Sequence, residues 1–234
     1  MPLGVPIICL VTDSRRLAHP QDDALVRLVR HAAAAGVDLI HVREPHRTDA
    51  DLVALTRRLV SAVGQTNTLV VVNDRVDVAI AAGAHGVHLR ADSFSGDRVR
   101  RIAPPGFLIG RSVHGEDEAV AARSGVDYLV FGTVYPTISK PGLAVPAGIA
   151  GLRAVCRRVS VPVLAIGGIS SDNVGELAAA GAAGVAAIGL FTEALNETSH
   201  GSHGSHGSNE HLDAALGRLV AAVRRGFPPG PPAE

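Results

Sequence analysis

The chain has 234 residues, of which 47% are hydrophobic, and its 22 Lys and Arg residues balance its 22 Asp and Glu residues. This composition excludes a disordered chain, and a net charge of zero without a basic stripe excludes nucleic acid as a partner. No apolar run approaches the roughly 20 residues that a membrane-spanning helix needs, and the N-terminus lacks the pattern of a signal peptide. We therefore expect a cytoplasmic protein with no membrane partner.

One sequence pattern recurs four times: an alanine-rich helical stretch, a glycine and then an apolar run. The glycines of the four copies are Gly36, Gly83, Gly125 and Gly181. Glycine is the usual residue just past a helix because it accepts the left-handed conformation. Continuous apolar runs are typical of parallel strands that are buried on both faces. Each copy therefore predicts the end of a helix and the start of a strand, and the spacing leaves room for a further strand between copies.

The predicted strands, in chain order, are Ile7–Val11, Leu39–Val42, Leu69–Val72, Val87–Leu89, Phe107–Ile109, Tyr128–Phe131, Val163–Ile166 and Val185–Ile188. The predicted helices are Ala24–Ala35, Ala50–Val63, Val76–Ala82, Asp97–Ile102, Asp117–Arg123, Ile149–Val159, Asn173–Ala180 and Leu212–Arg224. This regular alternation, without a glycine fingerprint after the first strand, favours a closed (β/α)8 TIM barrel over an open doubly wound sheet. We expect one domain over residues 1–234.

Two segments fall outside the barrel pattern. Residues 196–209 contain a tandem Ser-His-Gly tract, which predicts a flexible insertion. Its histidines lack the fixed geometry of a metal site, so we expect no metal there. The tail at residues 226–234 is rich in proline and predicts a frayed terminus.

The residues that follow each strand of a TIM barrel meet at one mouth, so these positions carry the functional predictions. Arg43 follows the second strand and either clamps a carboxylate or phosphate or forms a rim ion pair with Glu44. Asn73, Asp74 and Arg75 follow the third strand. Asp74 either holds a metal or orients Arg75, or the three residues cap the next helix.

Two further strand ends carry polar residues. After the fifth strand, an extended segment places the Ser112 hydroxyl beside the ring of His114. Histidine exchanges a proton near neutral pH, so His114 is either a general acid/base or a solvated bystander. The loop after the sixth strand contains Thr137, Ser139 and Lys140, and it either covers an anionic ligand or is a polar surface loop.

Glycines at the last two strand ends predict a phosphate site. Gly167 and Gly168 end the seventh strand, and Ile188, Gly189 and Leu190 end the eighth. Bare backbone N–H groups approach phosphate oxygens closely where no side chain intervenes. The alternative is that these glycines only form tight turns.

The motifs at the strand ends resemble those of the thiamine phosphate synthase and thiazole tautomerase superfamily, over about residues 6–195. Arg43, Asn73-Asp74-Arg75 and Gly167-Gly168 match the synthase motifs. The synthase pattern is broken at three positions: His41 replaces a glutamine, Pro45 replaces a lysine, and Ser93 replaces the second magnesium-binding aspartate.

The segment Gly110-Arg111-Ser112-Val113-His114 resembles the tautomerase branch, in which the histidine is the acid/base. This resemblance implies a thiazole tautomerase, an isomerase of thiamine biosynthesis that aromatises a carboxythiazole phosphate with His114 as catalytic residue and no required cofactor. The implied substrate-binding residues are Arg43, Asn73, Asp74, Ser112, Thr137, Ser139 and Lys140. The implied phosphate-binding residues are Gly167, Gly168, Ile188, Gly189 and Leu190.

Two alternatives stay open at this point. The first is thiamine phosphate synthase, a transferase that joins hydroxymethylpyrimidine diphosphate to thiazole phosphate with Mg²⁺. The second is a non-catalytic regulator that binds thiazole phosphate. The expected partner of the tautomerase is a small phosphorylated thiazole carboxylate, and the sequence leaves open a homo-oligomer.

Overall fold

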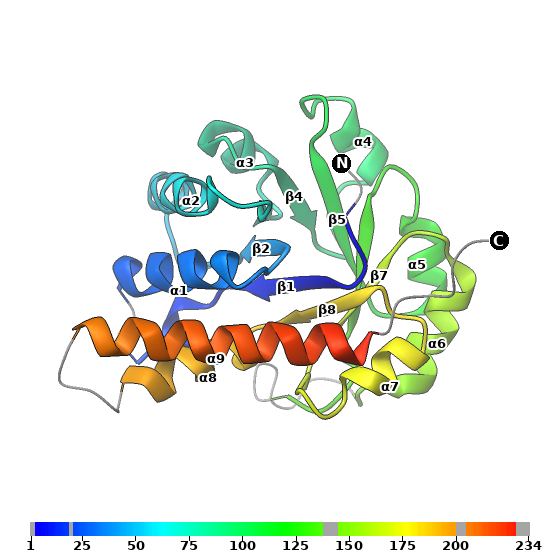
Figure 1. Cartoon of the computed structure of the whole chain (residues 1–234). Coiled ribbons are helices and arrows are strands. Elements are labelled where there is room, and N and C mark those ends of the chain that lie inside the picture. The colour runs from blue at the N-terminus through cyan, green and yellow to red at the C-terminus, as the bar shows by residue number, and fades with distance from the viewer. Residues whose placement is uncertain (1–2, 19–20, 138–144, 200–204, 228–234) are drawn as a thin grey trace.

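The computed structural model describes residues 3–18, 21–137, 145–199 and 205–227. Parallel strands close into a barrel in the chain order β1 to β8, and Figure 1 shows the helices around the outside of these strands. The strands are β1 (Ile7–Val11), β2 (Leu39–Val42), β3 (Leu69–Asn73), β4 (Gly86–Leu89), β5 (Leu108–Val113), β6 (Tyr128–Gly132), β7 (Val163–Ile166) and β8 (Gly184–Ala187). The prediction of a (β/α)8 TIM barrel is confirmed.

The helices are α1 (Asp22–Ala34), α2 (Asp49–Val63), α3 (Val76–Ala82), α4 (Gly96–Arg100), α5 (Glu116–Ala122), α6 (Gly148–Arg158), α7 (Val174–Ala179), α8 (Gly189–Ser199) and α9 (Ser205–Gly226), with a 3₁₀ turn, η1 (Ser14–Arg16), after β1. The sequence prediction missed α8. It also ended β5 too early, because Gly110, Arg111 and Ser112 interrupt the apolar run. Arg111 and Ser112 nevertheless pair in register with Leu129 and Val130 of β6.

Alternation along the strands separates two layers of buried side chains. In β1, Ile7, Cys9 and Val11 belong to the cluster inside the barrel, whereas Ile8 and Leu10 belong to the cluster beneath the helices. Because side chains alternate between the two faces of a strand, residues two apart share a layer. The same alternation directs the polar residues near the C-terminal strand ends toward the barrel axis, where they line one mouth.

Much of residues 196–209, the predicted flexible insertion, is helical. α8 continues to Ser199 and α9 begins at Ser205, so residues 196–199 and 205–209 are helical. The buried residues Leu212, Leu216 and Val220 anchor α9 to the barrel, and extending an anchored helix costs less than starting one. The predicted tail lies outside the described residues from position 228 onward. Within the described ranges, no helix is long and apolar enough to cross a membrane.

Candidate active site

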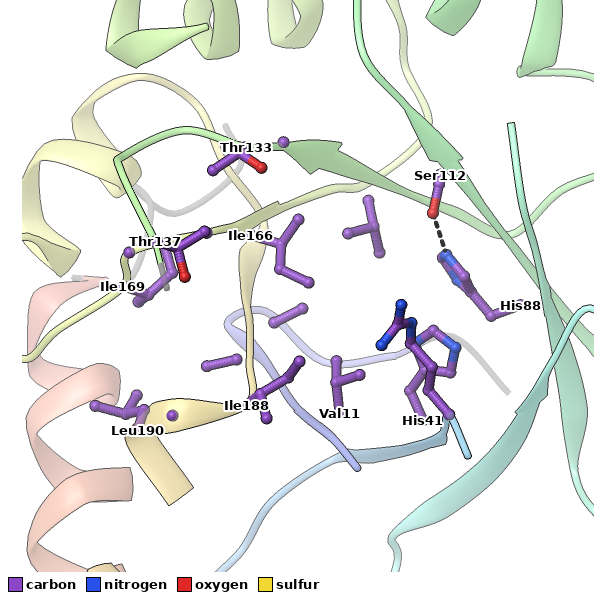
Figure 2. A pocket seen from close by; sticks show the side chains of 18 of the residues that line it. Val11, His41, His88, Ser112, Thr133, Thr137, Ile166, Ile169, Ile188 and Leu190 are labelled. Atoms are coloured by element: carbon purple, nitrogen blue, oxygen red, sulfur yellow. Dashed lines mark hydrogen bonds between the residues drawn. The ribbon is translucent and has the colours of Figure 1, made fainter. Parts of the chain in front are cut away.

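A cavity of about 1160 Å³ opens at the C-terminal end of the barrel. Figure 2 shows His41, His88 and Ser112 on one side of it, with Thr137, Ile169 and Leu190 on the other. The predicted site residues that line it are Arg43, Asn73, Ser112, His114, Thr137, Gly167, Gly168, Ile188, Gly189 and Leu190. Asp74 lies outside the lining set, and Ser139 and Lys140 lie outside the described residues. The structure therefore brings most of the predicted residues together at one mouth.

Two buried histidines form the floor on the side of β2 to β5. The rings of His41 and His88 lie 4.4 Å apart between centroids. Nε2 of His41 donates to Oδ1 of Asn73 at 3.2 Å. Burial lowers the pKa of His41 to about 3, and burial followed by the charge of His41 lowers the pKa of His88 well below its usual value. Both rings are therefore neutral near pH 7 and serve as hydrogen-bonding groups in the site.

The proton on His88 can be assigned from its neighbours. Its Nδ1 lies 3.1 Å from the Tyr128 hydroxyl, and its Nε2 lies 2.9 Å from the Ser112 hydroxyl. In the described part of the chain, the buried Tyr128 hydroxyl hydrogen-bonds only to His88, so it donates to Nδ1. The hydrogen of His88 then lies on Nε2 and is donated to Ser112. The Ser112 hydroxyl keeps its own hydrogen for a ligand in the cavity.

His114 lines the same cavity, and no hydrogen bond joins it to Ser112 among the described residues. Its Nδ1 donates to the carbonyl oxygen of Gly132 at 2.6 Å, and its backbone N–H donates to Glu118 at 2.7 Å. A ring fixed by its Nδ1–H leaves Nε2 as the group that can meet a ligand. The hydroxyl of Ser112 is instead bound by His88, from the neighbouring strand.

Gly167 and Gly168 of the predicted phosphate site are required by the backbone geometry. Gly167 and Gly168 have φ angles of 101° and 64°, a region that disfavours other residues. A Cβ on Gly168 would lie 2.6 Å from the carbonyl oxygen of Pro136. α8 begins at Gly189, so its unpaired N–H groups and the positive end of its dipole face the mouth. This arrangement suits a phosphate group.

Arg43 is available to an anionic ligand. The predicted alternative, an ion pair with Glu44, is wrong: both Glu44 carboxylate oxygens accept hydrogen bonds from Ser14, at 2.7 to 3.1 Å. The backbone N–H of Arg43 donates to the hydroxyl of Thr12 at 3.0 Å. No carboxylate among the described residues lies within 4.0 Å of the Arg43 guanidinium. Its charge contributes to the lowered pKa of Asp13, but it forms no direct ion pair with a carboxylate of the described residues.

Asp74 is the one carboxylate of the predicted substrate-binding set. It neither orients Arg75, which pairs with Asp49 and Asp77, nor caps α3. Its Oδ1 instead accepts a hydrogen bond from the hydroxyl of Ser93. Within the described ranges, no group of three or more His, Cys, Asp or Glu residues could hold a metal. Mg²⁺ at phosphate sites is often bound by one protein carboxylate, while phosphate and water supply the other oxygen ligands. The carboxylate of Asp74 fits Mg²⁺ only in this way.

The predicted site omits eight polar residues that line the cavity: Arg16, His41, His88, Arg90, Asp92, Thr133, Ser170 and Glu193. His88 left a signal, since a histidine inside a buried strand requires a polar partner. Arg16 follows β1, and the end of this strand carries none of the predicted site residues. Thr133 and Glu193 left no signal, because their positions depend on how the loop after β6 and the unpredicted α8 pack against the mouth.

Comparisons with known proteins agree with this architecture. The family model described as thiamine monophosphate synthase matches residues 8–191. The thiamine-phosphate synthase of Methanoculleus marisnigri is 44% identical over 156 residues, covering 66% of this chain and 74% of that protein. That of Methanocella arvoryzae is 41% identical over 178 residues, covering 74% of this chain and 81% of that protein. The solved thiamine phosphate pyrophosphorylase of Pyrococcus furiosus has a TM-score of 0.75 and 30% identity, covering 95% of this chain and 97% of that one.

These relatives overturn the prediction of a thiazole tautomerase. Several relatives at 38% to 44% identity over two thirds or more of this chain are named as synthases, so the isomerase assignment is wrong. The tautomerase prediction rested on the segment from Gly110 to His114, and one residue of this segment has a structural role. The Arg111 guanidinium donates to the carbonyl oxygens of Ala91, Ser93 and Phe94, which holds the loop after β4. An arginine at this position therefore does not indicate proton transfer.

Proposed function

This chain belongs to the thiamine monophosphate synthase family, and we propose that it joins hydroxymethylpyrimidine diphosphate to thiazole phosphate and releases diphosphate. The observation that carries this proposal is the 41% to 44% identity to relatives named thiamine-phosphate synthase. The family model matches residues 8–191, which contain every strand from β2 to β8 and the residues that follow them. The proposed activity is that of a transferase in thiamine biosynthesis.

The dimensions of the cavity support a reaction between two substrates. Its volume of about 1160 Å³ is at the upper end of ligand sites, which leaves room for both substrates. The side formed by β6 to β8 offers backbone N–H groups to the phosphate of the thiazole. The side formed by β2 to β5 offers Arg43, the neutral His41, Asn73 and the Ser112 hydroxyl to the other substrate, and His88 holds that hydroxyl in place.

The joining step requires charge stabilisation more than proton transfer. The thiazole nitrogen forms a bond to the methylene carbon of the pyrimidine as the carbon–oxygen bond to diphosphate breaks. The electron pair of the broken bond leaves with diphosphate, and the product ring carries the positive charge, so no proton moves. A fixed cation beside the leaving group lowers the barrier of such a step. Arg43, which lines the cavity, would supply that cation, and the step would not require His114 as a base.

The proposed reaction uses Mg²⁺, and Asp74 is the residue that could bind it. When bound, the ion would neutralise charge on the diphosphate and so improve it as a leaving group. Asp74 would be the carboxylate ligand, with the Ser93 hydroxyl beside it. Asp92, on the same loop, is paired with Arg90 at 2.6 Å and is largely exposed.

The direct test is an assay of the purified chain with both substrates and Mg²⁺, in which thiamine phosphate and diphosphate are measured separately. We expect equal amounts of the two products, and no diphosphate when thiazole phosphate is omitted. Chelation of the metal should stop both. Unchanged substrates in the complete mixture would contradict the proposal.

Ser93→Asp should lower the Mg²⁺ concentration for half-maximal activity by about tenfold, because a second carboxylate beside Asp74 strengthens the attraction for a hard cation. The control is Ser95→Asp, which adds the same charge at an exposed position two residues along the loop. A metal titration of the three proteins measures the effect. Equal midpoints for Ser93→Asp and the unchanged chain would remove Asp74 and Ser93 from the metal site.

A further inference from the structure

We propose that Arg16 recognises the phosphate of the thiazole substrate, together with the N-terminus of α8. The inference rests on the proposed function for the identity of the ligand, a heterocyclic alcohol esterified with phosphate. Arg16 is the last residue of η1, the turn after β1, and it lines the cavity. No sequence motif selected it.

The guanidinium of Arg16 lies at the predicted phosphate site. A Cβ built on Gly189 would lie 3.8 Å from an Nη atom of Arg16. Gly189 is the first residue of α8, and the N–H groups of Gly189 and Leu190 lie at the start of this helix, beside the cavity. Those of Phe191 and Thr192 already donate to the carbonyl oxygen of Ile188. A phosphate at the start of α8 would therefore lie within reach of Arg16.

The backbone of Arg16 is attached to α8 itself. Asn196, on α8, donates from its side-chain nitrogen to the carbonyl oxygen of Arg16 at 3.1 Å and accepts from the backbone N–H of Ala18 at 3.0 Å. At the other end of the turn, Ser14 is bound to the buried Glu44. The turn is thus held at both ends, and the position of Arg16 relative to the start of α8 is fixed.

The guanidinium of Arg16 has no hydrogen-bonding or ion-pair partner among the described residues, whereas its neighbour Arg15 pairs with Asp13 at 2.9 Å. Glu193 is the opposing charge: its Oε1 would lie 3.2 Å from the same built Cβ on Gly189. No ion pair within 4.0 Å joins Glu193 to Arg16. A phosphate would thus be attracted by Arg16 and repelled by Glu193.

This arrangement explains how the site can select a phosphorylated thiazole over the free alcohol. Backbone N–H groups bind phosphate but also tolerate a hydroxyl or water. A guanidinium that is charged at all working pH values forms short, charge-assisted bonds only with an anion. We therefore expect Arg16 to contribute to binding of the phosphate ester and little to binding of the alcohol.

The test compares dissociation constants of thiazole phosphate, its alcohol and inorganic phosphate for four proteins by calorimetry. Arg16→Ala should weaken binding of thiazole phosphate by about tenfold to a hundredfold, as expected for the loss of one or two charge-assisted hydrogen bonds. Binding of the alcohol should not change. Glu193→Gln should tighten binding of both phosphates, and Arg15→Ala is the matched control with no expected effect. Melting curves check that every variant is folded.

The outcomes separate this inference from the proposed function. If Arg16→Ala weakens phosphate binding but the unchanged chain forms no thiamine phosphate, then the inference holds and the proposed function fails. If the chain forms thiamine phosphate but Arg16→Ala binds thiazole phosphate as Arg15→Ala does, then Arg16 has no such role. Failure of the unchanged chain to bind either phosphate also overturns the inference. In the active enzyme, the effect should appear as a higher KM for thiazole phosphate with a nearly constant kcat.

Discussion

Arg43→Ala should lower the rate of thiamine phosphate formation by about a hundredfold to a thousandfold, the usual effect of removing one fixed group that stabilises charge in a transition state. The reason is the state of the guanidinium in the protein. It lies at the cavity, with its backbone held by Thr12, and no carboxylate of the described chain lies within 4.0 Å of it. The diphosphate is the ligand that would neutralise it.

Two variants make the result specific. Arg47→Ala removes an arginine four residues further on, but one that pairs with Asp22 and does not line the cavity. It should keep most of the activity. Arg43→Lys should recover only part of the lost rate, because an ammonium group supplies the charge without the bidentate geometry of a guanidinium. Steady-state kinetics with each substrate varied in turn would measure these effects. A rate for Arg43→Ala equal to that of Arg47→Ala would contradict the assignment.

Acidification should destabilise the folded chain through His41 and His88. The folded pKa values of both are lowered, that of His41 from 6.5 to about 3, because burial disfavours the charged rings. Below pH 6.5 the unfolded chain therefore binds protons that the folded chain does not, and stability falls as the pH drops from 6.5 toward 3. His41 contributes a loss of up to about 1.4 kcal/mol per pH unit in this window, which amounts to about 3 kcal/mol at pH 4. His88 adds a loss in the same direction. The contribution of His41 alone is a large share of a typical folding free energy.

Denaturant unfolding of variants between pH 7.5 and 4 would isolate this contribution. His41→Gln should lose less stability on acidification than the unchanged chain, by about 1 kcal/mol per pH unit below pH 6. Val71→Ala is the control, because Val71 pairs in register with His41 inside the barrel and carries no titratable group. Its cost in stability should be the same at every pH. A cost of His41→Gln that also stayed constant with pH would contradict the assigned protonation state.

The fold was predictable because its determinants are local. Residues 69–72 form a continuous run of leucine and valine, and Gly83 ends α3 with a φ angle of 69°. Such features need no knowledge of distant residues. The limits of β5 were missed because Arg111 and Ser112 are polar yet lie in a strand. They are tolerated because one holds the loop after β4 and the other lies at the cavity.

The choice of reaction was not predictable from the strand-end motifs alone. The five residues from Gly110 to His114 favoured a tautomerase, whereas the relatives match over 156 to 178 residues. Ser93 weakened the case for magnesium, but the structure shows its hydroxyl hydrogen-bonded to Asp74, a contact that the motif did not indicate. A short motif records residue types, and these do not specify what each side chain contacts.

The amino-acid sequence by itself determined the barrel, the direction of its mouth and most of the residues gathered there, because strand and helix periodicity place side chains at fixed intervals along the chain. Only the tertiary structure decided that Ser112 is bound by His88, that Glu44 is occupied by Ser14, and that Arg16 lies at the start of α8. The members of these pairs are 24 to 173 residues apart, and their contacts depend on how the barrel closes. Closure brings the first and last strands side by side, which local patterns along the chain do not describe.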